Sequence, residues 1–160
     1  MSKVALVLVG ALVLAEVALA ATPANPTTVR TEVEAAVRAY VDAANRGDVT
    51  TMMSMVDRSD GVISISDGVI ERGWQTIRNS NELVSRDEEA GISLGQVDVM
   101  VLGPTVAVAV APFTFTVASV HGAVRVPGAS SLVFQKAGTR WLLVHEHTSI
   151  TTQEVARGVD

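Results

Sequence analysis

His145 and His147 stand two positions apart near the C-terminal end of the chain, in a segment, 140–149, that we expect to form a β-strand. Alternate residues of a strand point to the same face, so both imidazoles share a face with Trp141 and Leu143. Imidazole exchanges a proton near neutral pH and can serve as a general base or acid. If this face lines a pocket, the pair predicts acid–base catalysis. Alternatively, both rings hydrogen-bond their neighbours and complete a pocket wall.

The same His-x-His spacing can hold zinc, because two rings on one strand face reach a common metal ion. A zinc site in a protein normally has at least three protein ligands. No third ligand is identifiable near these histidines, and the chain contains no cysteine. We therefore expect a pocket without a metal ion and without a cofactor.

Two aromatic residues are further candidates for the site. Tyr40 is the only tyrosine, and it lies on the apolar side of a helix that is predicted to begin at Val29. It is either a hydrogen-bond donor to a ligand or a core tyrosine whose hydroxyl is satisfied within the protein. Trp74, at the start of another predicted helix, either stacks on a ligand or packs that helix against a sheet.

The elements that must position these residues are helices in the first half of the chain and strands in the second. Apolar residues recur at helical spacing from 29 to 44, and Gly47 followed by Asp48 is typical of a helix end and the cap of a short second helix. A hairpin turning at Asp67-Gly68 and a third helix over 74–85 come next.

Four long strands are expected in the remainder, over 92–102, 105–118, 123–135 and 140–149. Helices first and a meander of strands afterwards predict an α+β fold rather than a parallel doubly wound sheet.

Three segments occur in the order found in a known superfamily: Tyr40–Asp48 with its Asn-Arg-Gly-Asp corner, the hairpin that precedes Arg72–Ile77, and the ending Gly138–Ser149, which contains Trp-Leu-Leu-Val-His-Glu-His-Thr-Ser. Together they resemble the SnoaL-like branch of the nuclear transport factor two-like superfamily, which includes ketosteroid isomerase. The resemblance covers about residues 29–149. It implies a cone-shaped, curved antiparallel sheet wrapped around three N-terminal helices, with one apolar pocket.

The resemblance to ketosteroid isomerase implies three functional positions in that pocket. Tyr40 corresponds to the tyrosine donor, whereas Ser64 and Ser130 correspond to the general-base aspartate and the buried acid. A serine hydroxyl cannot replace a carboxylate base at neutral pH, so ketosteroid isomerisation is disfavoured. The same alignment directs the odd-numbered residues 143–147 of the last strand inward. The expected site thus has His145, His147 and Tyr40 as catalytic candidates, lined by Trp141, Leu143, Ser64, Ser130 and Trp74.

The N-terminal end is predicted to direct export. Lys3, an apolar run to residue 15, and Ala18 and Ala20 are typical of a secretory signal cleaved after residue 20. A linker over 21–28, a domain over 29–149 and a tail over 150–160 complete the expected organisation, in a secreted or periplasmic protein. The net charge of −5 without a basic run excludes nucleic acid as an expected partner, and no membrane association is expected after cleavage.

Three functions fit this sequence. The first is an exported pocket domain that binds a small hydrophobic or amphipathic molecule. The second is a cofactor-free acid–base enzyme, a dehydratase, cyclase, isomerase or hydrolase, that uses His145 and His147 with Tyr40. The third is an interaction module that forms a homodimer through its sheet and has a vestigial pocket. The alternating valines and alanines over 105–111 could supply the flat face for such pairing, or face the core of one subunit.

Overall fold

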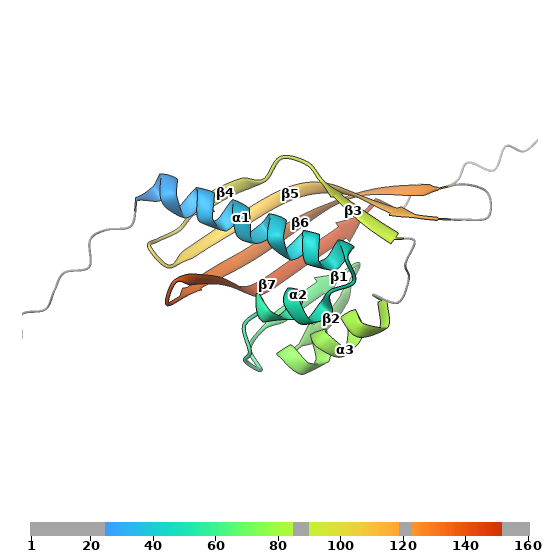
Figure 1. Ribbon diagram of the computed structural model, residues 1–160, viewed down its shortest axis with the longest axis horizontal. Coiled ribbons are helices and arrows are strands. Elements are labelled where there is room, and N and C mark those ends of the chain that lie inside the picture. Colours follow the sequence, from blue (N-terminus) through green and yellow to red (C-terminus); the bar gives the residue numbers. More distant parts are fainter. Residues whose placement is uncertain (1–24, 85–89, 119–122, 152–160) are drawn as a thin grey trace, which may run out of the picture.

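Helices α1, α2 and α3 and a curved seven-stranded sheet make up the described part of the computed structural model, which comprises residues 25–84, 90–118 and 123–151 (Figure 1). The helices are α1 (Pro26–Asn45), α2 (Val49–Ser54) and α3 (Trp74–Val84). The strands are β1 (Ile63–Ser66), β2 (Val69–Arg72), β3 (Ala90–Leu94), β4 (Asp98–Val101), β5 (Val106–Val117), β6 (Val124–Ala137) and β7 (Arg140–Ile150). The predicted secretory signal lies outside the described residues.

Helix α1 begins at Pro26, three residues earlier than the sequence pattern predicts, and so includes the end of the expected linker. The side chain of Asn25 accepts a hydrogen bond from the backbone N–H of Thr27 at 3.0 Å, and proline suits the first helical position because its missing N–H has no partner there. The predicted corner is confirmed at the other end. Gly47 has φ of 64°, and Asp48 Oδ1 accepts from the N–H of Thr51 at 2.9 Å to cap α2.

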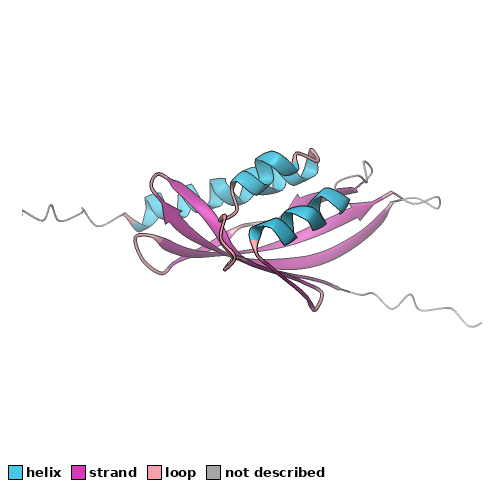
Figure 2. Cartoon of the chain, turned by 90° about the horizontal axis from the view of Figure 1, so that it is seen from below, coloured by secondary structure: helices cyan, strands magenta, loops and turns pink. Residues whose placement is uncertain are grey.

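The strand order is β2-β1-β7-β6-β5-β3, with β4 paired to β5 beside β3. All neighbours are antiparallel except β1 and β7, which pair in parallel. The predicted hairpin turn is present, since Asp67 and Gly68 both adopt positive φ. The predicted α+β fold with a curved, open sheet is therefore confirmed, and the hairpin forms one edge of that sheet (Figure 2).

The single strand expected over 92–102 is divided into β3 and β4. Leu94 pairs with Phe113 and Asp98 pairs with Val110, so the chain advances four residues where β5 advances three. Gly95 lies in the break, and its N–H donates to the carbonyl of Pro112 at 2.8 Å. The extra residue makes this break a β-bulge, and the two strands that it separates both contact α1.

A second irregularity interrupts β7. His145 pairs with Val133 and Leu143 pairs with Phe134, which leaves Val144 as an extra residue opposite two consecutive partners. Since side chains alternate between the faces of a strand, this bulge reverses which residues point inward beyond it.

The core lies between α1 and the inner face of β5, β6 and β7. The apolar stripe of α1 is almost fully buried, and so are the alanines of β5, whose small side chains let the helix approach the sheet closely. The central members are Val29, Val33, Val37, Ala107, Ala109, Ala111, Phe134 and Leu143. Within the described ranges, no helix is both long and apolar enough to cross a membrane.

Candidate functional site

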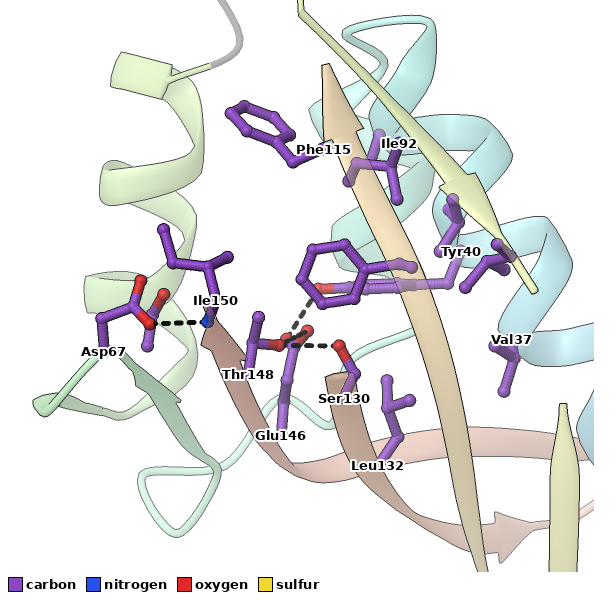
Figure 3. A pocket seen from close by; sticks show the side chains of 15 residues that line it. Val37, Tyr40, Asp67, Ile92, Phe115, Ser130, Leu132, Glu146, Thr148 and Ile150 are labelled. Atoms are coloured by element: carbon purple, nitrogen blue, oxygen red, sulfur yellow. Dashed lines mark hydrogen bonds between the residues drawn. The ribbon is translucent and has the colours of Figure 1, made fainter. Parts of the chain in front are cut away.

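A cavity of about 270 Å³ lies between the C-terminal half of α1 and the inner face of β3, β5, β6 and β7 (Figure 3). Its wall is mainly apolar and includes the rings of Phe113 and Phe115. The other apolar residues are Val37, Val41, Ala44, Ile92, Leu94, Leu132 and Ile150. The volume is near the lower end of the range for small-molecule sites, roughly 300–1,000 Å³, so the cavity suits a small ligand.

Four polar side chains form one hydrogen-bonded group on this wall. The hydroxyl of Tyr40 donates to Glu146 Oε2 at 3.2 Å, and the hydroxyl of Thr148 makes a longer contact of 3.4 Å with Glu146 Oε1. The hydroxyls of Ser130 and Thr148 are 2.9 Å apart, so Ser130 donates to Thr148 when Thr148 donates to the carboxylate. Figure 3 shows Glu146 at the centre of this group, with α1 supplying the tyrosine and β6 and β7 the rest.

Burial shapes the protonation of both acidic groups. Removal from water raises the pKa of Glu146 above its usual value, and the hydrogen bonds from Tyr40 and Thr148 offset part of that rise. Burial, together with the neighbouring Glu146 carboxylate, raises the pKa of Tyr40 well above its ordinary value. Tyr40 is thus a neutral donor throughout the physiological range, and Glu146 is the member of this hydrogen-bonded group that can exchange a proton.

The bulge at Val144 decides which residues of β7 reach the cavity. Glu146 and Thr148 line it, so His145 and His147, which alternate with them, point to the opposite face of the sheet. The prediction that both imidazoles face the pocket is wrong, because it extended the alternation of Trp141 and Leu143 through an irregularity that only the pairing with β6 reveals. His147 is exposed, and His145 is half-buried.

Of the remaining predicted residues, Tyr40 and Ser130 line the cavity as expected. Leu143 and Trp141 face inward but are buried in the core away from it; Trp141 Nε1 donates to Glu32 Oε2 at 2.8 Å beside a separate shallow hollow. Ser64 is beside Glu146 in the β1–β7 register but is not among the lining residues.

Trp74 also lies away from the cavity. Its indole N–H donates to the carbonyl of Met53 at 3.0 Å, and the guanidinium groups of Arg58 and Arg78 are 4.8 and 5.4 Å from the ring centre. These contacts match the packing role that the sequence left open and not the ligand stacking expected of a lining residue.

Glu146 is the functional residue that sequence reasoning missed. It carries the pocket's central carboxylate, and the argument that disfavoured ketosteroid isomerisation rested on the serines at 64 and 130 without counting it. The available indication was an acidic residue between His145 and His147 in a predicted strand. Within the described ranges, the site included, no group of three or more His, Asp or Glu side chains is arranged to hold a metal ion.

An open, curved sheet packed against α1, with an apolar cavity and a few convergent polar groups, is a fold shared with solved structures described as nuclear transport factor 2-like (NTF2-like) proteins. The sequence model of the SnoaL-like domain family matches residues 33–153, and the chain belongs to that family. No curated protein matches the chain.

Solved structures share the fold at low sequence identity. An NTF2-like superfamily protein from Salmonella enterica serovar Typhimurium is 24% identical with a TM-score of 0.71, over 84% of this chain and 99% of that one. A candidate dehydratase of the NTF2-like family from Streptomyces avermitilis is 21% identical with a TM-score of 0.71, over 81% and 100% of the two chains. The association domain of C. elegans CaMKII is 18% identical with a TM-score of 0.65, over 77% and 96%.

Proposed function

We propose that this SnoaL-like domain binds a small, mainly apolar molecule that carries one polar group, and that Glu146 and Tyr40 hold this group. The observation that carries the proposal is the cavity itself, in which mainly apolar walls surround one hydrogen-bonded group of four polar side chains. Such a combination is the usual composition of a small-molecule site.

The placement of Glu146 supports a role beyond folding. A carboxylate removed from water lowers stability unless a cation compensates it, and the raised pKa of Glu146 reflects this effect. The carboxylate of Glu146 contacts two hydroxyl groups. The described lining residues include no cationic side chain that would compensate its charge. Groups held in such unfavourable surroundings within a cavity are characteristic of functional sites.

The same observation favours a second candidate function, that of a cofactor-free acid–base enzyme. A carboxylate with a raised pKa is a better proton acceptor than an ordinary one and can return the proton in a later step. Glu146 would take the proton and Tyr40 would remain a neutral hydrogen-bond donor. In this form of the proposal, Glu146 is the general base in place of the two histidines. Isomerisation, dehydration and other proton-transfer reactions use a carboxylate base beside a neutral hydrogen-bond donor.

Identification of a molecule that co-purifies with the protein tests the binding function directly. We expect mass spectrometry of extracts from the purified protein to detect one small, mainly apolar compound. Tyr40→Phe should weaken its binding about two- to tenfold, the effect of losing one hydrogen bond of roughly 0.5–1.5 kcal/mol. His147→Gln, on the opposite face, is the matched control and should bind normally. Equal loss in both variants would contradict the assignment of the site.

Export remains part of the proposal. It rests on the basic, apolar and small-residue segments of residues 1–20, which are typical of a cleaved secretory signal. The absence of cysteine from the sequence makes the mature domain independent of disulfide formation in a secreted or periplasmic setting.

Homodimer formation through the sheet is also proposed. The alternation of β5 turns Ala107, Ala109 and Ala111 towards the core and the valines towards the opposite face. That outer face carries apolar residues of β1, β5 and β6 beside His145, His147, Ser131 and Asp98, and it includes Val110, which is 42% exposed. The CaMKII relative of this fold is described as an association domain, and a second copy of this chain would cover the corresponding apolar surface.

A further inference from the structure

We propose that the pocket selects a cationic apolar molecule, a small lipophilic amine, and rejects carboxylates. This inference rests on the proposed binding function and specifies the chemical class of its ligand. It follows from the charges, the open hydrogen-bonding positions and the aromatic rings that line the cavity.

The charged groups on the cavity wall are of one sign. Glu146 lies at its centre, and Asp67 lies at its edge, where Asp67 Oδ1 accepts from the backbone N–H of Ile150 at 3.0 Å. In the described ranges, no lysine, arginine or histidine is among the lining residues. A ligand carboxylate would bring a further negative charge into an apolar space without a partner, whereas an ammonium group would supply the missing opposite charge.

The hydrogen bonds around Glu146 leave room for such a donor. Its two oxygens together offer about four acceptor positions. Tyr40 occupies one at 3.2 Å, and Thr148 approaches a second only at 3.4 Å. A primary ammonium has three N–H donors and no acceptor, so it complements the remaining positions.

The apolar walls suit the rest of the ligand. Phe113 and Phe115 line the same cavity, and aromatic faces attract a cation in addition to burying hydrocarbon. A neutral ketone would take its hydrogen bond from Tyr40 and leave an ionised Glu146 without an opposite charge, whereas an amine pairs with the ionised form and offsets the unfavourable burial of its charge. The amine therefore interacts favourably with both the Glu146 carboxylate and the aromatic rings of the cavity wall.

Three probes with one aromatic body and different polar groups test the proposal: 2-phenylethylamine, 2-phenylethanol and phenylacetate. Their binding to the mature domain at pH 7 can be measured by isothermal titration calorimetry. We expect the amine to bind at least about tenfold more tightly than the alcohol, a difference of about 1.4 kcal/mol. We expect phenylacetate to show no saturable binding.

Glu146→Gln keeps the shape and the acceptor for Tyr40 but removes the charge. It should abolish the preference for the amine while the alcohol still binds. Asp67→Asn is the matched control, because its side-chain oxygen can still accept from Ile150. In this control, the preference for the amine should persist.

The failures of the two proposals are distinguishable. If the alcohol or phenylacetate binds as tightly as the amine, or if Glu146→Gln retains the amine preference, the charge selectivity is overturned and the pocket function stands. If none of the three probes binds and no small molecule co-purifies, both proposals are overturned.

Discussion

The surroundings of Glu146 disfavour the ionised form of its carboxyl group. Desolvation on the cavity wall exceeds the compensation from its hydrogen bonds, so the protein is more stable when this carboxyl is neutral. Selection for folding alone would favour a neutral side chain at this position. Its presence there is therefore better explained by the ligand or substrate that it meets.

Glu146→Gln should stabilise the protein at neutral pH. A carboxyl whose folded pKa is raised stabilises the fold below its unfolded pKa of about 4.5, and this contribution is lost as pH rises through the folded pKa. Glutamine does not ionise, so the variant does not lose this stability as pH rises. We expect its melting temperature to exceed that of the parent at pH 7–8 and to equal it near pH 4, measured by circular dichroism. A variant less stable than the parent at pH 7 and unchanged at pH 4 would contradict the raised pKa.

Two individual site residues, Tyr40 and Ser130, were predictable from the sequence. Tyr40 was predictable because the helical period and the position of Gly47-Asp48 depend on neighbouring residues only. Ser130 was placed through the family resemblance. The histidines were misplaced and Glu146 was missed, because their faces depend on how β7 pairs with β6.

Among the helices and strands, features caused by neighbouring residues were predictable from the sequence, and features caused by pairing between distant strands were harder to predict. The corner at Gly47-Asp48 and the turn at Asp67-Gly68 have their causes within a few residues, and both were predictable. The bulge at Val144 and the break at Gly95 arise from pairing across strands. The bulge leaves no clear mark on the sequence, whereas the break falls at a glycine inside the expected strand. One extra residue exchanges the two faces of a strand.

Gly128→Ala tests how closely β5 and β6 approach beside the cavity. A Cβ at position 128 would clash with Cζ of Phe113 and lie 2.6 Å from the carbonyl oxygen of Ser149. The ring of Phe113, a cavity wall, would have to move. We expect destabilisation of about 1–3 kcal/mol by urea unfolding, together with weaker ligand binding.

Gly91→Ala is the matched control in β3, because a Cβ there meets no atom within 4 Å. Its effect should not exceed about 0.5 kcal/mol, the usual limit for a surface substitution away from special features. Similar losses in both variants would indicate a general effect of replacing strand glycine and not the predicted contact with Phe113.

For the whole molecule, the first question is where the mature chain begins. We expect export with cleavage after Ala20, because Ala18 and Ala20 supply the small side chains that signal peptidase accepts. N-terminal sequencing of exported protein should start at Ala21, and Ala18→Arg should leave the precursor uncleaved. An exported form that still starts at Met1 would refute the prediction.

The second question is what covers the outer face of the sheet. Two rows of side chains cross it in register. One row contains Ile65, His147, Ser131, Val110 and Asp98, and the other contains Ile63, His145, Val133, Val108 and Met100. This arrangement settles which side the valines of β5 take, a question that sequence alternation left open. The predicted histidines lie among apolar neighbours on this face.

We expect the mature protein to be a dimer at micromolar concentration in light scattering after size-exclusion chromatography, since apolar strand faces of this kind favour association. Val110→Lys should produce a monomer with an unchanged melting temperature, because Val110 is exposed in a single copy and a buried charge at the centre of an interface opposes pairing. Leu83→Lys replaces an apolar residue of α3 that is 67% exposed and lies away from this face; it should remain dimeric. A monomeric parent, or a Val110→Lys variant that stays dimeric, would contradict association through the outer sheet face.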